Sequence, residues 1–283
     1  MKFGGKAIQS IELISKSCLN KIQIKIFNFL LERDFNNIYY TANFNNYSNT
    51  APLIESVCAR LGKPLIIFCD SGFVIPRNYL KFKNLLFITI DWNEKTDARL
   101  FAKIFKIMPH LFFPKTKVTT WLDSNISIKK DDVSLLFLLE DCDLVLFRHD
   151  KRNSVTEEYM DCLNFKKDSS KKLEEFSRFL IDNKDPGFLC QGRIIYRKTS
   201  VKVQKFNEIW WEYIQKGSIR DQLSLPYAIS KSNVSTNILA SSRLLELFRI
   251  YFHNKISYSH RSKSMNFLLS LRNTILKMRD FFK

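Results

Sequence analysis

The first half of the chain alternates between short apolar runs and longer amphipathic segments. Four runs have the length and the β-branched and aromatic content that are typical of strands: 37–41, 64–69, 85–90 and 118–122. Two segments between them repeat apolar residues with helical spacing: 52–61 and 97–108. Because strands and helices alternate in this order, the sequence predicts an α/β fold with a mostly parallel central sheet flanked by helices.

The second half of the chain continues this pattern. Strands are predicted at 143–147 and 193–197. Helices are predicted at 157–163, 171–183 and 203–215, and residues 218–227 open another helix.

Length and composition indicate one large domain with an extension at each end. Of the 283 residues, 45 % are hydrophobic and 25 are Phe, so the chain can bury a substantial core. We expect a basic helical extension at 1–36, the α/β domain at 37–239 and a basic amphipathic helical tail at 240–283. An ordinary core-facing helix is the alternative for the first of these.

Targeting features and cysteine spacing indicate a cytoplasmic protein. No apolar stretch approaches the roughly 20 residues of a transmembrane helix. The first 25 residues lack the apolar block and cleavage site of a secretory signal. The six cysteines form no Cys-x-x-Cys pair, which is typical of reduced thiols and not of a zinc cluster or a disulfide framework.

The net charge of +17 calls for an anionic partner. Neither zinc-finger spacing nor the aromatic signature of an RNA-recognition domain is present. Residues 240–283 hold nine Lys or Arg and two acidic residues, interleaved with apolar ones. Because the charge gathers in this tail, peripheral contact with an anionic membrane is favoured over nucleic acid. A charged glycan remains open as the tail's partner.

Polar residues follow several of the predicted strands. Thr41, Asp70, Asp91 and Asp123 fall at the carboxyl ends of the first four. In parallel α/β sheets ligands bind beyond these ends. The sequence therefore predicts a ligand site at this edge of the sheet.

Asp123 and Asn125 form the candidate metal site. In an extended segment residues two apart point to the same side, so both oxygens could face one point after the strand 118–122. Carboxylate and amide oxygens suit magnesium or manganese, which bridge phosphates in this way. A turn or a helix cap is the structural alternative for this Asp-x-Asn.

A cationic stripe lies on the helix that precedes this strand. Arg99, Lys103 and Lys106 are spaced as one face of the helix 97–108. They could face a diphosphate or orient Asp123, and a solvated helix face is the alternative. The buried side of the helix is predicted from its apolar residues: Leu100, Phe101, Ile104, Ile107 and Met108.

His149 and Arg152 lie in the short loop after the predicted strand 143–147. This position suits contacts with the hydroxyl groups of a substrate. Helix capping and an ion pair with Glu157 or Glu158 form the alternative.

Six blocks in chain order carry a resemblance to a known family: 39–42, 106–110, 121–126, 147–152, 206–212 and 220–224. The strongest are Trp-Leu-Asp-Ser-Asn-Ile at 121–126 and Trp-Trp-Glu at 210–212 followed by Arg-Asp-Gln-Leu-Ser at 220–224. Together they resemble a family of glycosyltransferase-like proteins first defined as a domain of unknown function. Its plant members act in mucilage and cell-wall polysaccharide synthesis, and its bacterial members occur among surface-polysaccharide genes. The resemblance covers roughly residues 38–228.

The resemblance implies a GT-A-type fold, a nucleotide-sugar donor (a UDP-sugar) and a divalent metal, manganese or magnesium. It assigns Asp123 to the metal or to donor positioning, with Asn125 as a supporting ligand. His260 near the C-terminus would complete the metal site, and a surface histidine is the alternative. The family often has Gly at position 124, where this chain has Ser, and this departure weakens the assignment of the metal.

The resemblance also implies roles for residues outside the metal site. Thr41 and Asp70 would hold the nucleotide base and ribose. Asp221 and Gln222 would lie beside the reacting sugar, with Asp221 as general base in an inverting enzyme or as a sugar ligand in a retaining one. An N-cap carboxylate is the structural alternative for Asp221.

We therefore expect a cytoplasmic glycosyltransferase that extends a surface glycan of lipopolysaccharide or capsule type. Its acceptor would be a glycan or a lipid-linked glycan, and the protein could lie at the inner face of the plasma membrane. Two alternatives are a basic nucleic-acid-binding protein without catalysis and a degenerate transferase that binds a donor without turnover.

Overall fold

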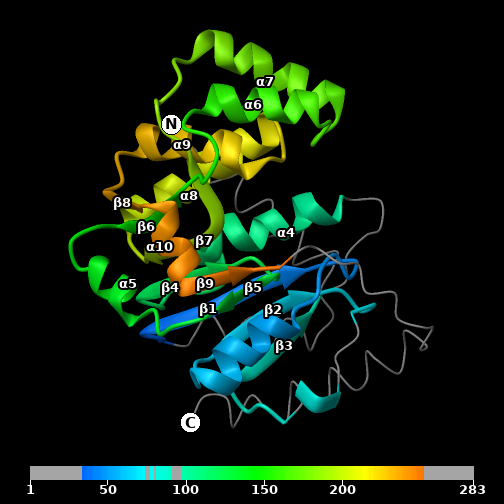
Figure 1. The fold of residues 1–283 in the computed structure, drawn as a ribbon, viewed down its shortest axis with the longest axis vertical. Coiled ribbons are helices and arrows are strands. Elements are labelled where there is room, and N and C mark those ends of the chain that lie inside the picture. The colour runs from blue at the N-terminus through cyan, green and yellow to red at the C-terminus, as the bar shows by residue number, and fades with distance from the viewer. Residues whose placement is uncertain (1–33, 74–76, 80, 91–96, 252–283) are drawn as a thin grey trace. The chain divides into compact units, whose positions relative to one another are not determined.

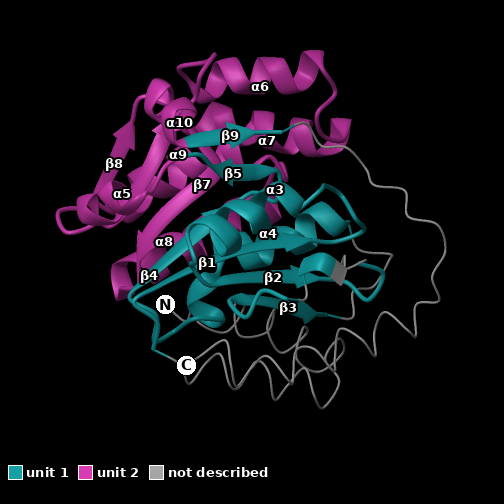
Figure 2. Ribbon diagram, turned by 60° about the horizontal axis from the view of Figure 1, so that its bottom comes forward, with its two compact units in different colours: residues 1–129, 248–283 teal, residues 130–247 magenta. Residues whose placement is uncertain are grey.

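The structure is a computed structural model that describes residues 34–73, 77–79, 81–90 and 97–251 (Figure 1). The chain divides into two compact units (Figure 2). Unit 1 comprises residues 1–129 and 248–283, and unit 2 comprises residues 130–247. The extension 1–33, Asp91 and the tail from residue 252, which includes His260, lie outside the described residues.

Unit 1 contains four parallel strands in the order β3-β2-β1-β4. They are β1 (Asn37–Asn43), β2 (Leu65–Cys69), β3 (Leu85–Thr89) and β4 (Val118–Leu122). Every residue of β2 and β3 is buried, as expected for strands whose apolar runs are uninterrupted. These strands confirm the predicted parallel arrangement, although β1 runs two residues beyond its predicted end at 41.

Helical segments connect these strands. α3 (Ala51–Ile54) continues as the π-helical segment η1 (Glu55–Arg60), and short 3₁₀ turns form η2 (Arg77–Tyr79) and η3 (Pro109–Leu111). α4 (Ala98–Ile107) begins where the Asp97 side chain accepts a hydrogen bond from the Arg99 N–H, at 2.8 Å. On α4, Phe105 stacks on Phe68 of β2 with ring centroids 4.5 Å apart, so the helix is fixed against the sheet.

Unit 1 also contains a short antiparallel pair, β5 (Ile126–Ile128) with β9 (Phe248–Ile250). The predicted strand-like alternation at Ile126 and Ile128 is confirmed. The prediction of a wholly helical tail from residue 240 is wrong at β9. Here a three-residue apolar edge gains backbone hydrogen bonds from β5 that a continued helix would not provide.

Unit 2 is built on three strands. β6 (Leu144–Arg148) pairs antiparallel with β7 (Cys190–Lys198) and parallel with β8 (Thr236–Leu239). Its helices are α5 (Val133–Leu138), α6 (Val155–Asn164), α7 (Ser170–Asp182), α8 (Val201–Lys216), α9 (Asp221–Ser232) and α10 (Ser241–Leu247). The strands and helices predicted between 143 and 227 are all found, with ends shifted by one to three residues.

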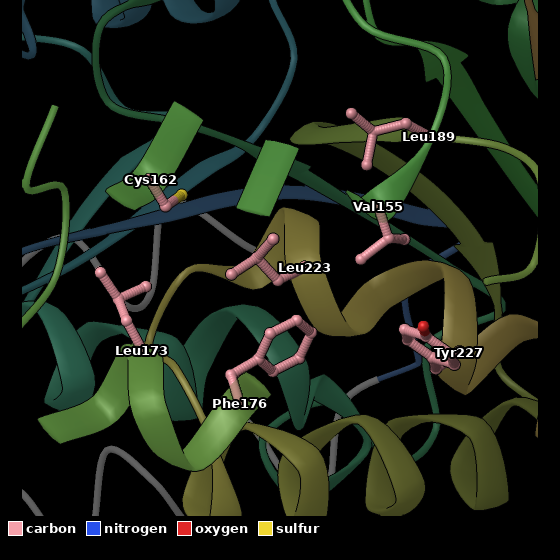
Figure 3. Packing of buried hydrophobic residues seen from close by; sticks show 7 residues of the cluster. All are labelled: Val155, Cys162, Leu173, Phe176, Leu189, Leu223 and Tyr227. Carbon is pink, nitrogen blue, oxygen red and sulfur yellow. The ribbon is translucent and has the colours of Figure 1, made fainter. Parts of the chain in front are cut away.

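Side-chain caps explain where three of these helices begin. Ser154, Ser169 and Ser200 each accept a hydrogen bond from the N–H three residues later. One apolar cluster then joins α6, α7 and α9 (Figure 3). Val155 and Cys162 of α6 and Leu223 of α9 belong to it, so the beginnings of α6 and α9 are held by shared packing.

Helix length and hydropathy determine whether a helix can span a bilayer. Among the described residues, none of the helices is both long and apolar enough to span a membrane.

Candidate functional site

Asp123 follows β4 directly, and its carboxylate is held from two sides. Its Oδ1 accepts a hydrogen bond from the Trp121 indole at 2.8 Å, and the Lys106 ammonium lies 3.3 Å from the same oxygen. Trp121 and Asp123 are two residues apart on extended chain, which places both side chains on one face. The Asp123 side chain is 27 % exposed, so solvent and ligands can reach the carboxylate.

Lys106, the third residue of the cationic stripe, is not part of a solvated helix face. Its side chain is only 3 % exposed, and its ammonium lies 5.5 Å from the centroid of the Trp121 ring. A buried ammonium needs a compensating charge, which Asp123 supplies. Three interpretations were given for the stripe. The contact with Asp123 agrees with a role of Lys106 in orienting that carboxylate, and the burial of Lys106 excludes a solvated face for this residue.

The other two residues of the stripe lie elsewhere on α4. Arg99 is exposed and pairs with the capping residue Asp97 at 3.1 Å, whereas Lys103 is half-buried. The apolar side of α4 also differs from the prediction: Phe105 is fully buried, and Leu100 and Ile104 are only half-buried. The helix is rotated toward Phe105 because that ring fills the space against β2.

Asn125 lies two residues beyond Asp123 in a buried turn. Its Nδ2 donates to the Tyr251 carbonyl at 2.5 Å, and the Tyr251 N–H donates back to the Asn125 carbonyl at 2.9 Å. These bonds fix the amide so that its Oδ1 is buried without a hydrogen-bond donor among the described residues. A buried oxygen of this kind is a suitable ligand for a hard cation.

These residues fit a magnesium or manganese ion that is held mainly by its substrate. Such ions are often bound through one or two protein oxygens together with substrate phosphates. Asp123 and Asn125 supply a partly exposed carboxylate and an unpaired carbonyl oxygen, whereas no group of three His, Cys, Asp or Glu side chains suited to a metal occurs in the described ranges. The third predicted ligand, His260, lies outside those ranges.

Asp70 connects the loops that follow β1 and β2. Its carboxylate accepts hydrogen bonds from the N–H groups of Asn45 and Gly72, the latter at 2.8 Å. A Cβ on Gly72 would lie 3.0 Å from the Asp70 carboxylate, so a larger residue here would press the carboxylate out of this position. Asp70 follows β2 as predicted, and both of its oxygens bind backbone of this chain.

Thr41 does not lie at the end of a strand. It is fully buried inside β1, which continues to Asn43, so the predicted position at a strand end is wrong. The apolar residue Ala42 extends the strand pattern past Thr41, and Asn43 pairs with Cys69 of β2. Asn43 then donates through its side chain to the Ser48 carbonyl at 2.6 Å and begins the polar loop.

Ser124, where the family often has glycine, contacts this polar loop. Its hydroxyl is hydrogen-bonded to the Ser48 hydroxyl, and both side chains are buried. The loop itself turns through two consecutive residues with positive φ, Asn45 and Asn46, a conformation that Asn tolerates better than most residues. The Asp123–Asn125 turn and the loop after β1 are therefore joined through Ser124.

In unit 2, His149 follows β6 and is almost completely buried. Its Nδ1 accepts from the N–H groups of Lys151 and Arg152 at 3.1 and 3.2 Å, and the Arg152 guanidinium lies 3.0 Å from its Nε2. Burial, together with the positive charge of Arg152, lowers the pKa of His149 below its ordinary value. The ring is therefore neutral at pH 7.

Arg152 takes part in a cluster of charged side chains at the start of α6. Its guanidinium pairs with Glu158 at 2.5 Å and with Asp161. Lys167 lies 3.7 Å from Glu158 and 3.5 Å from Asp161. The predicted alternative of an ion pair between Arg152 and Glu158 is confirmed.

Asp221 and Gln222 are the first two residues of α9, and both are buried. The N-cap position belongs to Arg220, so the prediction that Asp221 caps this helix is wrong. The backbone at Arg220 is extended, and the helix begins one residue later than an Asp221 cap requires. As a first-turn residue Asp221 still lies at the positive end of the helix dipole, where acidic side chains are favoured.

Arg220 joins this pair to the charged cluster. Its Nη2 lies 3.4 Å from the Gln222 side-chain oxygen and 3.6 Å from Glu158. Burial lowers the pKa of Arg220, but the negative charges of Asp221 and Glu158 outweigh it and raise the pKa above its ordinary value. The guanidinium is thus a permanent cation beside Gln222.

Several predicted residues are therefore found in contact, and others are not. Lys106 contacts Asp123 in unit 1, and His149 contacts Arg152 in unit 2. The contribution of Arg220 was missed, although it precedes Asp221 in the motif Arg-Asp-Gln-Leu-Ser. The contribution of Trp121 was also missed, although its i, i+2 spacing from Asp123 on a strand indicates a shared face.

Family comparison identifies the class of protein. Residues 85–256 match a family model described as TOD1/MUCI70, glycosyltransferase-like domain. The match covers more than half of the chain, and the chain belongs to this family. The prediction of the family, with its glycosyltransferase-like domain, is confirmed.

Three solved structures resemble the chain in fold. The bifunctional glycosyltransferase WbbM, in its apo form, is 13 % identical at a TM-score of 0.45, covering 88 % of this chain and 51 % of WbbM. Mouse xyloside xylosyltransferase 1, in its apo form, is 11 % identical with a TM-score of 0.43. The match covers 82 % of this chain and 99 % of the xylosyltransferase. The galactosyltransferase LgtC, in complex with donor and acceptor sugar analogues, is 12 % identical with a TM-score of 0.43. The match covers 86 % of this chain and 95 % of LgtC. The chain thus spans about half the length of WbbM. No curated protein matches the sequence.

Proposed function

We propose that this protein transfers a sugar from a nucleotide-sugar donor, a UDP-sugar, to a growing surface glycan of lipopolysaccharide or capsule type. The observation that carries the proposal is Asp123, a partly exposed carboxylate at the carboxyl end of a parallel strand with a buried cation beside it. Membership in a glycosyltransferase-like family supports the same assignment.

The residues around Asp123 suit the binding of a nucleoside diphosphate. Lys106 and Trp121 hold Oδ1, which leaves Oδ2 without a contact among the described residues. Oδ2 and the Asn125 Oδ1 are then the oxygens that would hold manganese or magnesium, with His260 as a further candidate. When bound, the metal neutralises the charge that develops on the departing diphosphate.

Other residues of unit 1 would support the donor. Asp70 fixes the loops after β1 and β2, where the base and ribose are expected, and Thr41 supports that loop from inside β1. Arg99 and Lys103, on the same helix as Lys106, are the nearest candidates for electrostatic attraction of the diphosphate.

In unit 2, the start of α9 suits the chemistry of a hydroxyl nucleophile. Asp221 is a buried carboxylate at a helix N-terminus, and in an inverting enzyme it would act as the general base for an acceptor hydroxyl. In a retaining enzyme the same carboxylate would stabilise a cationic transition state. His149, kept neutral, and Arg152 would bind sugar hydroxyls.

The acceptor and the location of the protein follow from its charge. We propose a glycan or lipid-linked glycan acceptor and peripheral binding at the inner face of the plasma membrane through the basic residues 240–283. Flotation with anionic liposomes tests this part: deletion of residues 252–283 should abolish binding, and unchanged binding would reject the role of the tail.

Detection of turnover tests the proposal. The full-length protein is incubated with manganese and a panel of nucleotide sugars, and release of the nucleoside diphosphate is measured with and without oligosaccharide acceptors. One donor should be consumed by the wild type, and D123A and D221N should each reduce turnover by at least about 100-fold. D141A is the control, because Asp141 is exposed and is not one of the assigned residues. Equal turnover in all variants would contradict the proposal, and binding without turnover would indicate a degenerate transferase.

A further inference from the structure

Glu158 is a carboxylate on the core-facing side of α6. It is fully buried and shares that side with Val155 and Cys162, at positions i, i+3 and i+7 of the helix. An ionised group at such a position is unfavourable unless it is compensated by opposite charge. Three cations surround it: Arg152 at 2.5 Å, Lys167 at 3.7 Å and Arg220 at 3.6 Å.

Two of these cations touch residues that are assigned to substrate binding or catalysis. Arg152 lies against His149, with 3.0 Å between Nη2 and Nε2. Arg220 lies against Gln222, with 3.4 Å between Nη2 and Oε1. Glu158 is therefore a common partner of cations that precede α6 and α9, two helices that also share apolar packing (Figure 3).

The contact with Arg220 determines which way the Gln222 amide faces. A guanidinium has only hydrogen-bond donors, so it must be met by the side-chain oxygen of Gln222 and not by its NH₂ group. The NH₂ group then points away and has no acceptor among the described residues. In this orientation Gln222 can donate a hydrogen bond to an oxygen of the substrate.

We infer that Glu158 is a positioning residue: it holds Arg220, and through Arg220 it fixes the Gln222 amide with its NH₂ group directed to a substrate oxygen. The inference rests on the proposed function for the role of that oxygen. The orientation itself depends only on contacts within unit 2.

The cluster contains a matched control for this inference. Asp161 pairs with Arg152 and Lys167, as Glu158 does, but only Glu158 also contacts Arg220. E158Q keeps the shape of the Glu158 side chain and removes its charge. D161N makes the equivalent change at Asp161, about one helical turn further along α6. A difference between the two variants therefore reports on Arg220.

The first readout needs no substrate. The side-chain NH₂ signals of Gln222 in a ¹⁵N NMR spectrum, assigned by their loss in Q222E, should move in E158Q and R220Q and stay in place in D161N. Signals that stay in place in E158Q, or that move equally in D161N, would overturn the inference. Movement of the signals without turnover of any donor would leave the positioning role intact and reject the proposed function.

The second readout is kinetic and uses the donor found by the turnover screen. E158Q and R220Q should each lower kcat by about tenfold, the equivalent of one lost hydrogen bond, with a smaller change in KM. The kcat of the double variant E158Q/R220Q should be no lower than that of R220Q, because both substitutions act on the same Gln222 amide. Additive losses of kcat in the double variant would show that Glu158 and Arg220 act independently, and would overturn the inference. A loss of kcat in D161N equal to that in E158Q would show a general effect of the charged cluster, and would also overturn it.

A further variant keeps the test decisive if E158Q does not fold. R220K retains the positive charge beside Glu158, but a lysine ammonium does not reproduce the planar guanidinium whose Nη2 lies 3.4 Å from Gln222 and 3.6 Å from Glu158. Its Gln222 signals should move and its kcat should fall by about tenfold. Unchanged signals and kcat in R220K would contradict the inference.

Discussion

Asp123 and Glu158 are both carboxylates beside basic side chains, but their surroundings differ. Asp123 pairs with Lys106 at 3.3 Å and keeps 27 % of its side chain exposed. Glu158 contacts three cations and is completely buried. The difference indicates that Asp123 retains capacity for a ligand, whereas the capacity of Glu158 is used within the protein.

The same comparison separates binding from positioning. A carboxylate with one free oxygen at the end of a strand can exchange protein contacts for a cation or a phosphate-bound metal. A carboxylate enclosed by fixed guanidinium groups cannot do so without leaving those charges uncompensated. Removal of Asp123 should therefore reduce function more than stability, and removal of Glu158 should reduce both.

The largest expected effect is on stability at Glu158. E158Q removes the buried charge that pairs with Arg220 and part of the compensation of Arg152 and Lys167, and should lower the free energy of unfolding by about 3 kcal/mol. D123N keeps an acceptor for the Trp121 indole and should lower it by only about 1 kcal/mol. Urea unfolding of both variants measures the difference. Equal losses would remove the distinction between an open and an enclosed carboxylate.

A smaller effect is expected at Lys106. K106M removes a positive charge 3.3 Å from the Asp123 carboxylate, so manganese should bind more tightly. Even at the dielectric of bulk water, the repulsion between unit charges about 4 Å apart is about 1 kcal/mol, so the gain in affinity should be at least roughly fivefold.

Electron paramagnetic resonance of free manganese measures this affinity in the presence of a nucleoside diphosphate, because the ion is expected to be held mainly by its substrate. R99M is the matched control, because Arg99 lies on the same helix and pairs with Asp97. If manganese bound equally well to K106M, R99M and the wild type, the ion would not be held at Asp123.

The smallest expected effect is the acid sensitivity of His149. Its pKa is lower in the folded protein than in the unfolded chain, because burial and Arg152 disfavour the charged ring. The unfolded state therefore binds the proton more readily. The stability associated with His149 is complete above the unfolded pKa of about 6.5 and is lost as the pH falls toward the folded value.

Unfolding in urea at pH 7.5, 6.5 and 5.5 tests this sign. The wild type should lose more stability on acidification than H149N, in which no proton is taken up at this position. An equal loss in both proteins would show that other groups account for the acid sensitivity.

β2 and β3 could be predicted because each is a nearly continuous apolar run of strand length, and β1 and β4 because their β-branched and aromatic residues are typical of strands. Short elements were missed: α5 and β8 span six and four residues, which is too short for a period to be recognised. β9 was predicted as helix because its pairing with β5 joins residues 120 to 124 positions apart. Such pairing leaves no local signal.

The candidate site was predictable only where local geometry determines it. Asp123 could be found because it ends a strand, and its partner Trp121 lies two residues before it. The direction of Lys106 could not be read from helical spacing, which places it with Arg99 on one stripe. The contact between Glu158 and Arg220 joins side chains on α6 and before α9, and only the packing of those helices brings them together.

The most direct test of the account is whether Asp123 binds a nucleotide-sugar donor. Thermal unfolding of the full-length wild type, D123A and D141A should be followed with a panel of nucleotide sugars, with and without manganese. A ligand that binds only the folded state raises the apparent stability by mass action. We predict that one donor raises Tm in the presence of manganese for the wild type and D141A, and not for D123A. No shift with any donor, or an equal shift in D123A, would contradict the account.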